Sequence, residues 1–396
     1  MPRHITVLLL MYLGVILVGF LWALLDRSNI ENYPVKNLVS EELINTVKWV
    51  LPGILLFDGC RTRRRVVMTV ACVLAMYFLL AIQIAKRFPP SAVLSGDTIE
   101  KAAKLCMRIG YSRVDMSTFL AGTFWGIIAA MSLVRQKKYK MFVLAAAGIT
   151  AFAQAATGGR AGYLAWGATG LVLCLLKWRK YLVLAPVIMI LLPLIFPGPV
   201  ERMLKGFGEI DVAGQSAIDS SSVTSGRMEI WPYVIDKISE SPIVGYGRLA
   251  MRRTGLYDQM TLKGHTGFTH AHNMYLETLL DNGILGSLPI FLFWGIVVIY
   301  SARLFKSDNR LYSVVGGFAL SLVLVQLFAG IGSQHFYPEE STLGMWIAMF
   351  LSLRVYLEQA RTQENLMTTE NFWNGQLLQP QQVADASGYA YGMTLR

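Results

Sequence analysis

Three of the five histidines in the chain lie close together, at His265, His270 and His272. An imidazole titrates near neutral pH, so histidine is the usual general base where a proton must leave a hydroxyl group. A metal site is one alternative, but on a helix His270 and His272 would be rotated by about 200° and one ion could not easily bind both. A surface histidine pair that caps a helix is another. We expect a general base and no bound metal.

Arg160 lies in the segment TGGRAG (157–162), between two apolar stretches. A guanidinium at a membrane margin is costly unless it is paired or faces a wet cavity, which makes it a functional candidate. An arginine that reaches lipid headgroups would give the same pattern. The flanking glycines favour a binding site, because they let a ligand approach the backbone closely.

Arg227 falls in the first turn of a predicted helix, where unpaired N–H groups and the helix dipole favour an anion. Together with Arg160 it could hold a pyrophosphate through charge-assisted hydrogen bonds, each contributing about 1.5 to 3 kcal/mol. A surface salt bridge with Glu229 is the alternative. A further histidine, His335, lies in SQHFYPEE (333–340), whose aromatic side chains suit stacking on a sugar or an interfacial aromatic belt.

Two helices are predicted to position these side chains. The first begins after an N-cap at Thr224-Ser225, is kinked by Pro232 and buries one face, formed by Ile230, Trp231, Val234, Ile235 and Ile238. The second runs from about His270 to Asp281, stops at Asn282-Gly283, and has an apolar face formed by Tyr275, Leu276, Leu279 and Leu280.

The composition predicts an all-α polytopic membrane protein. The 396 residues are 54% hydrophobic and only 15% charged, which is too apolar for an ordinary soluble domain. The first apolar block is followed directly by Asp26-Arg27, without a small-residue cleavage site, so it is expected to be a retained span and no removed signal peptide. Ten spans are predicted from blocks long enough to cross the bilayer, near 5–25, 43–57, 66–85, 117–134, 141–157, 161–176, 181–198, 288–305, 311–333 and 340–357.

Basic loops fix the predicted topology. The segments 58–65, 135–140, 177–180 and 303–310 are rich in arginine and lysine, which places them and both termini in the cytoplasm. The same loops account for the net charge of +11, so no nucleic-acid partner is expected. The intervening segments, which contain all the candidate residues, must then face the other side of the membrane.

The chain divides into four predicted regions. Residues 1–198 form N-terminal membrane helices, 199–287 an extracytoplasmic loop that is too long for a connector, and 288–357 C-terminal membrane helices. The polar, Gln-rich segment 358–396 is expected to be a disordered cytoplasmic tail. Segment 86–116, with Ile99, Leu105, Met107 and Ile109, predicts either an amphipathic helix on the membrane surface or a plain connecting loop.

Several motifs together resemble the O-antigen ligase and polymerase superfamily. They are TGGRAG at the end of a span, SVTSGRMEIW (222–231) followed by ESPIVGYG (240–247), and HAHNMYLE (270–277) before DNGILG (281–286). The resemblance covers the fifth to the eighth predicted span, and its motifs are specific for the superfamily but separate its members poorly. Two features depart from the family pattern: Gly159 stands where serine is familiar, and ten spans are counted where twelve are often described.

The resemblance implies a fold of the GT-C type with about 10–12 membrane helices, in the bacterial inner membrane, with its active site facing the periplasm. It implies a metal-independent, inverting glycosyltransferase without a cofactor. The donor would be a glycan linked to undecaprenyl pyrophosphate, and the acceptor the lipid A-core or another glycan. By motif, Arg160 and Arg227 would bind the pyrophosphate and His272 would be the catalytic base. The residues that would bind substrate are His270, Asn273, Glu277, Tyr246 and His335.

Three acceptors remain open within the superfamily. A ligase joins the glycan to lipid A-core, a polymerase joins it to a second lipid-linked repeat, and a protein O-oligosaccharyltransferase joins it to serine or threonine. The ligase is preferred for the size and simple loop plan of the chain. A transporter or flippase is the alternative of a different class, but it should carry charges near the middle of its spans, whereas here they lie at span margins.

Overall fold

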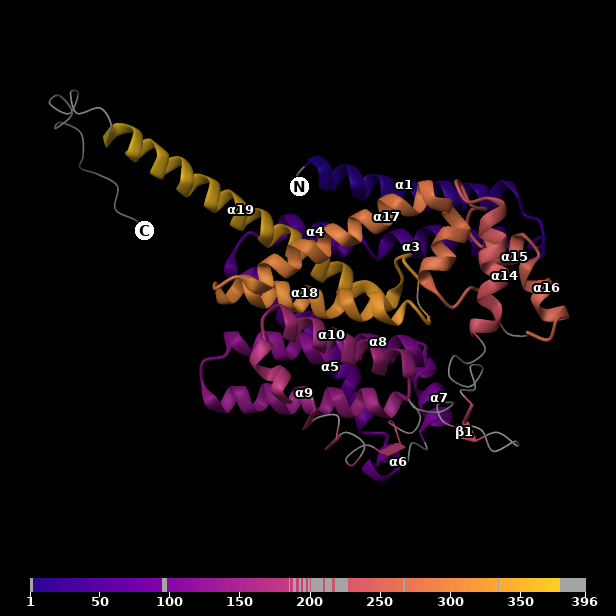
Figure 1. Cartoon of the computed structure of the whole chain (residues 1–396), viewed down its shortest axis with the longest axis horizontal. Helices are drawn as coiled ribbons and strands as arrows, with labels where there is room; N and C mark the ends of the chain where they lie inside the picture. Colours follow the sequence, from indigo (N-terminus) through magenta and orange to yellow (C-terminus); the bar gives the residue numbers. More distant parts are fainter. Residues whose placement is uncertain are drawn as a thin grey trace. The chain divides into compact units, whose positions relative to one another are not determined.

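A computed structural model describes most of the chain (Figure 1). The described residues are 3–94, 98–184, 227–265, 268–333 and 335–377, with 186–187, 190–191, 194, 197–198, 200, 209–210 and 216–217 between them. Two compact units are distinguished, Met1–Arg354 and Val355–Arg396. All candidate site residues belong to the first unit.

Long apolar helices dominate the first unit, as predicted for a polytopic membrane protein. Six helical segments of the described chain are long and apolar enough to span a membrane: α1 (Arg3–Leu25), α5 (Arg63–Ala85), α8 with its 3-10 extension (Arg113–Leu133), α9 (Lys137–Thr157), α17 (Met274–Lys306) and α18 (Arg310–Ala329). A shorter apolar helix, α10 (Arg160–Leu176), packs beside α8 and α18. Judged by length and apolar composition, the described residues contain fewer membrane-spanning helices than the ten to twelve predicted.

The predicted span 43–57 is not one helix. The chain forms α2 (Val35–Asn37), a π-helical segment (Leu38–Ile44) and α3 (Asn45–Lys48), and restarts as α4 (Leu51–Gly59). Pro52 lies in the first turn of α4, where its missing N–H does no harm; inside a continuous helix it would have removed a hydrogen bond. The predicted span 181–198 contains a 3-10 segment, Arg179–Leu184, and then falls largely outside the described residues.

The helix α18 is the centre of the bundle. It contacts α8, α10 and α17, and 78% of its apolar window is buried, against 33% for α1 and for α9. The peripheral helices expose large apolar side chains such as Leu10, Val18 and Phe142. Exposed apolar surface on this scale suits lipid contact and would be unfavourable in water.

The long helix α17 is broken at Gly283, which has a positive φ of 57° and a ψ of −168°. The backbone of residues 242–243 enters the break, since Ile284 N donates to Pro242 O at 2.8 Å and Leu285 N to Ile243 O at 3.0 Å. A side chain at position 283 would meet Ile243 O at 2.3 Å. The predicted stop at Asn282-Gly283 is thus confirmed as a break, but the predicted start at His270 is wrong, because α17 begins at Met274 after the N-cap Asn273.

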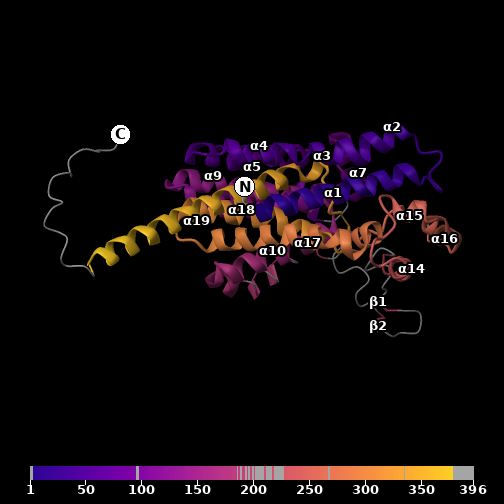
Figure 2. The same cartoon turned by 90° about the horizontal axis from the view of Figure 1, so that it is seen from above.

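A small helical region precedes α17. It consists of α14 (Arg227–Glu240), α15 (Ala250–Arg253) and α16 (Leu256–Leu262). These helices share one hydrophobic core, which includes Ile230 and Val234 of α14 and Leu280 of α17. Ile235, predicted on the buried face of α14, is 52% exposed. The predicted N-cap, Thr224-Ser225, lies outside the described residues. Figures 1 and 2 both show α14, α15 and α16 together at one end of the bundle, on the right.

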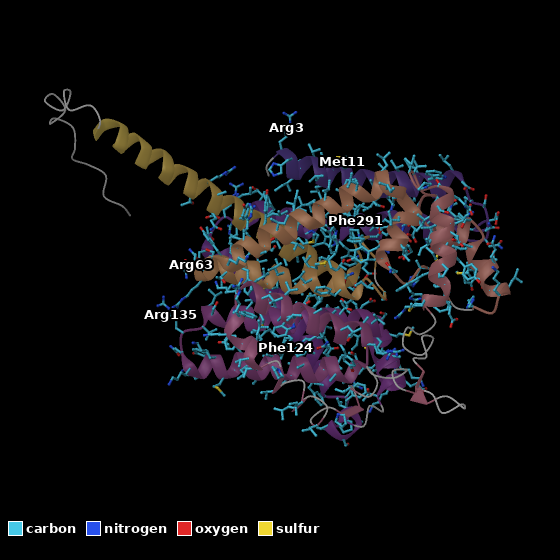
Figure 3. All side chains as sticks on the ribbon, in the orientation of Figure 1. Arg3, Met11, Arg63, Phe124, Arg135 and Phe291 are labelled. Atoms are coloured by element: carbon cyan, nitrogen blue, oxygen red, sulfur yellow. The ribbon has the colours of Figure 1, made fainter. Side chains whose placement is uncertain are left out.

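The opposite end of the bundle carries basic loops. Arg63 and Arg135, from two of the loops predicted to be cytoplasmic, lie at the left end in Figure 3, which has the orientation of Figure 1. The helices α14 to α16 lie at the right end. The basic loops and the candidate site residues are therefore separated by the length of the membrane helices.

The remaining elements are short, except for the last helix. The segment after α5 forms α6 (Pro90–Leu94) and the amphipathic helix α7 (Ile99–Ile109); its buried side chains are Ala102 and Cys106, and Met107, predicted on the apolar face, is 75% exposed. Two-residue strands, β1 (Glu209–Ile210) and β2 (Ser216–Ala217), pair antiparallel. A 3-10 turn, η4 (Glu340–Thr342), leads into α19 (Leu343–Leu377).

Residues 358–377, expected to belong to a disordered tail, are helical, because α19 continues to Leu377. Glutamate, glutamine, leucine and methionine, which are common in this segment, are all good helix formers, so a polar composition did not exclude a helix. Residues 378–396 lie outside the described part of the chain.

Candidate active site

The histidine segment forms a tight turn between α16 and α17. His272 adopts a left-handed conformation with φ 48°, which is uncommon for any residue with a side chain. The next residue, Asn273, caps α17: its Oδ1 accepts from Tyr275 N at 3.0 Å and from Leu276 N at 3.2 Å. Met274 N donates to Gly330 O at 2.8 Å, so the turn is also fixed to the end of α18.

The two imidazoles of this turn lie against each other. The ring centroids of His270 and His272 are 3.8 Å apart, and His272 N donates to His270 Nδ1 at 3.3 Å. The prediction that the side chains of His270 and His272 point to opposite faces of a helix was wrong, because both residues precede α17. Within the described residues, no group of three or more histidine, cysteine or acidic side chains could hold a metal ion.

Arg227 is brought to this turn, and Arg160 lies near Arg227. Each is the first residue of its helix, α14 and α10. Burial lowers the pKa of Arg227, and the neighbouring charge of Arg160 lowers it further; the charge of Arg227 in turn acts on His272. In the described part of the chain the Arg227 guanidinium has no hydrogen bond or ion pair to a protein group. A half-buried cation without a protein partner suits an anionic ligand.

The glycines around Arg160 have a different reason from the one predicted. A Cβ at Gly159 would meet Ser117 Cβ at 2.7 Å, and a Cβ at Gly162 would meet Ser117 Oγ at 2.1 Å. They allow α10 to pack closely on α8. Arg113, the first residue of α8, donates to Gly158 O at 3.2 Å. Sequence reasoning missed this third arginine at the same end of the bundle.

Both histidines of the turn are neutral at physiological pH. Burial lowers the pKa of His272 to about 4, and the charge of Arg227 contributes. Burial also lowers the pKa of His270 to about 3, with His272, His335 and two arginines adding to the effect. His272 Nδ1 is buried without a hydrogen-bond partner among the described residues. A neutral imidazole with a free nitrogen is the form that a general base requires.

A polar cavity of about 290 Å³ lies on the His270 side of the turn. Its wall includes Glu42, Arg248, Glu277 and Asp281. Arg248 Nε pairs with Glu42 Oε2 at 2.6 Å, and Arg248 Nη1 approaches Asp281 Oδ2 at 3.4 Å. Sequence reasoning missed Glu42, Arg248 and Asp281 as site residues, although charges near predicted span ends were a signal for Glu42 and Asp281.

His335 also reaches this cavity, but its ring is already engaged. Nε2 lies 3.0 Å from Glu339 Oε2, and Nδ1 lies 2.9 Å from Tyr337 O. Although burial lowers its pKa, the Glu339 carboxylate outweighs this and raises the pKa of His335 to about 9. The neighbouring aromatics Phe336 and Tyr337 are each only 2% exposed, which fits neither of the two roles considered for them, stacking on a sugar or an interfacial belt. They pack inside the bundle instead.

Two other predicted substrate residues have structural contacts. Asn273 uses its side-chain oxygen as the cap of α17. The Tyr246 hydroxyl donates to Lys237 O at 3.2 Å and lies 3.2 Å from Glu240 Oε2. That is the C-terminal end of α14, whereas Arg227 is at its start, so Tyr246 is not brought to the histidine turn.

The fold and the site define an all-α polytopic membrane protein with arginines and a neutral histidine gathered at one end. Residues 141–291 match the Wzy_C family, described as O-antigen ligase, and this range includes Arg160, Arg227 and His272. The resemblance to the O-antigen ligase superfamily is therefore confirmed.

Individual relatives match over shorter stretches. The ComP-specific O-oligosaccharyltransferase of Acinetobacter baylyi is 30% identical over 118 residues, 29% of this chain and 21% of that protein. A protein of Rickettsia conorii, provisionally named a polysaccharide ligase, is 25% identical over 162 residues, 39% of this chain and 38% of that protein. The general O-oligosaccharyltransferase of Acinetobacter baylyi is 28% identical over 185 residues, 44% of this chain and 32% of that protein. The chain thus matches well under half the length of each of these relatives.

Proposed function

We propose that this protein is an inverting glycosyltransferase that moves a glycan from undecaprenyl pyrophosphate to an acceptor hydroxyl on the periplasmic side of the inner membrane. The acceptor is a sugar of the lipid A-core, as in an O-antigen ligase. One observation carries the proposal: a neutral His272 lies beside the half-buried guanidinium of Arg227, and neither His272 Nδ1 nor this guanidinium has a partner among the described residues. The match of this region to the O-antigen ligase family supports it.

The reaction is a single displacement. His272 Nδ1 takes the proton of the acceptor hydroxyl, and the hydroxyl oxygen forms a bond to the anomeric carbon of the donor. The bond between that carbon and the pyrophosphate oxygen breaks at the same time, and its electron pair leaves with undecaprenyl pyrophosphate. Attack opposite to the leaving group inverts the anomeric centre.

The arginines act on the leaving group. Negative charge accumulates on the pyrophosphate as the bond breaks, and the guanidinium groups of Arg227 and Arg160 stabilise it. Both groups are positioned by helix starts, whose free N–H groups add to the positive potential. This arrangement is rigid before the donor binds, so little reorganisation is required during the reaction.

The test is reconstitution of the purified protein with undecaprenyl-pyrophosphate-linked glycan and lipid A-core. His272→Ala should lower the transfer rate by about 100- to 10,000-fold, while His265→Ala, in the same segment, should keep it within about threefold of wild type. His265 faces Glu229 at 3.3 Å and is the matched control. Full activity of His272→Ala would remove the base from the mechanism.

A second function is favoured by the relatives. Two of them are named O-oligosaccharyltransferases, so this chain could use a protein hydroxyl as acceptor with the same donor. The reconstituted protein should therefore also be given a serine-containing peptide and a second lipid-linked repeat, each in place of lipid A-core. The glycosylated product that forms identifies the acceptor class.

A further inference from the structure

The His270–His272 pair separates two environments of opposite character. On one side lies Arg227, whose charge acts on His272, and the charge of Arg160 acts in turn on Arg227. On the other side is the cavity of about 290 Å³, whose wall carries the carboxyl groups of Glu42, Glu277 and Asp281. A pyrophosphate suits only the first side, because carboxylates repel it.

Of the three cations in the cavity wall, Arg252 has no ion pair with a described residue, whereas Arg248 and His335 are already neutralised. Arg248 pairs with Glu42 at 2.6 Å and lies 3.4 Å from Asp281, and Asp281 also accepts from the Tyr337 hydroxyl at 2.9 Å. His335 pairs with Glu339 at 3.0 Å. These charges are committed to protein partners, so they offer little to a second anion.

Glu277 is the carboxyl group left over. Its Oε2 is buried and has no hydrogen-bond partner among the described residues. The nearest imidazole nitrogen, His270 Nδ1, is 3.7 Å away, which is too long for a hydrogen bond. That nitrogen also accepts from His272 N, so it has no proton to donate. A buried acceptor atom without a donor is costly and requires an O–H or N–H group from a ligand.

We propose that this cavity is the acceptor site, and that Glu277 binds a neutral sugar there by accepting a hydrogen bond from one of its hydroxyl groups. The inference rests on the proposed function and specifies its acceptor side. Thr269 and His270 line the same cavity, and the His272 ring is 3.8 Å from that of His270. The proposed base is therefore next to a side chain of the cavity wall.

The size of the cavity agrees with this ligand. A volume of about 290 Å³ lies at the lower end of the range for small-molecule sites, about 300–1,000 Å³, and accommodates one sugar ring. A second cavity of about 320 Å³ shares Glu42, Arg248 and His335 with it and also carries Trp49. The next sugar of an oligosaccharide acceptor can occupy this neighbouring space.

The test measures acceptor and donor use separately in the full-length protein in proteoliposomes. Glu277→Gln keeps the shape of the side chain but weakens it as an acceptor, and should raise the KM for lipid A-core roughly tenfold or more. The KM for undecaprenyl-pyrophosphate-linked glycan and the hydrolysis of this donor by water should stay within about twofold of wild type. Thr269→Ala should raise the acceptor KM to a smaller extent and decides the outcome if Glu277→Gln does not insert. Glu100→Gln is the control, because Glu100 is exposed on α7 and pairs with Lys104.

A binding measurement keeps the inference separate from the proposed function. The delipidated core oligosaccharide, titrated calorimetrically without donor, should bind wild type more tightly than Glu277→Gln, even if no transfer is detected. Donor hydrolysis without any wild-type transfer to lipid A-core would count against the proposed ligase but not against this site. The proposal would be overturned if both variants left the acceptor KM and the oligosaccharide affinity unchanged. It would also be overturned if the donor KM rose as much as the acceptor KM, or if a peptide serine were the only acceptor used.

Discussion

Arg248 and Glu42 are 206 residues apart in the chain, and Arg248 Nε lies 2.6 Å from Glu42 Oε2. Both side chains are largely buried, at 13% and 11% exposure. The Arg248 guanidinium also lies 3.6 Å from the centre of the Tyr337 ring. Together these contacts join the segment after α1, the loop before α15 and the loop after α18 around the proposed acceptor cavity.

Removal of Arg248 should destabilise this end of the protein. Arg248→Ala leaves the buried carboxylates of Glu42 and Asp281 without their cation, which should lower the free energy of unfolding by about 3 to 5 kcal/mol. Thermal unfolding of the detergent-solubilised protein measures it. Arg61→Ala is the control, because its pair with Asp58 is 62% and 75% exposed and should contribute at most about 1 kcal/mol. Equal losses in both variants would contradict the buried network.

The break in α17 should depend on glycine at position 283. Gly283→Ala introduces a side chain at positive φ and within 2.3 Å of Ile243 O, so the free energy of unfolding should fall by about 2 kcal/mol or more. Gly295 lies in the same helix, and a Cβ there meets no atom of the described chain within 4 Å. Gly295→Ala should therefore change stability by less than about 0.5 kcal/mol. Similar melting temperatures for the two variants would show that residues 242–243 do not enter the helix.

The rate of glycan transfer should not fall near pH 6.5, because His272 remains neutral there. The pKa of His272 is lowered to about 4 and that of His270 to about 3, so kcat/KM should show no inflection from His272 between pH 8 and about pH 5. Between about pH 4 and pH 6.5 the unfolded chain binds more protons at these residues than the folded chain. The contribution of these two histidines to the free energy of unfolding should therefore rise with pH through this window and reach its full value above about pH 6.5. An acid limb near pH 6.5 that persists in His265→Ala would contradict a neutral, buried His272.

Arg227 should act on the donor and not on the acceptor. Arg227→Ala removes a guanidinium that has no hydrogen bond or ion pair to the described part of the chain, so the protein should fold normally while kcat/KM for the lipid-pyrophosphate donor falls about 100-fold or more. Arg227→Lys should recover only part of the loss, because an ammonium cannot form the bidentate contact. Initial rates with each substrate varied in turn separate the two effects, and Arg108→Ala, an exposed residue of α7, is the control. An equal rise in the acceptor KM would argue against pyrophosphate binding.

The sequence alone determined the class of the protein and the residue types of its site. Apolar blocks and basic loops depend on local composition, because each membrane helix satisfies its own backbone hydrogen bonds and each charge selects a side of the bilayer. The break at Gly283 was also predictable from local sequence, because Asn-Gly is a common signal for the end of a helix. The arginines at helix starts and the histidine segment were also visible as local patterns, and the family match covers them.

Only the tertiary structure decided how these groups meet. The turn at His270 and His272 precedes its helix because Asn273 caps α17 and Met274 is bonded to Gly330, a contact between distant segments that no local pattern contains. The pairing of Arg248 with Glu42 and Asp281, the orphaned oxygen of Glu277 and the close packing at Gly159 and Gly162 likewise depend on helices far apart in the chain. The sequence shows which residue types are present. Their protonation states and partners were set by the fold, because burial and charge pairing depend on all neighbours in space.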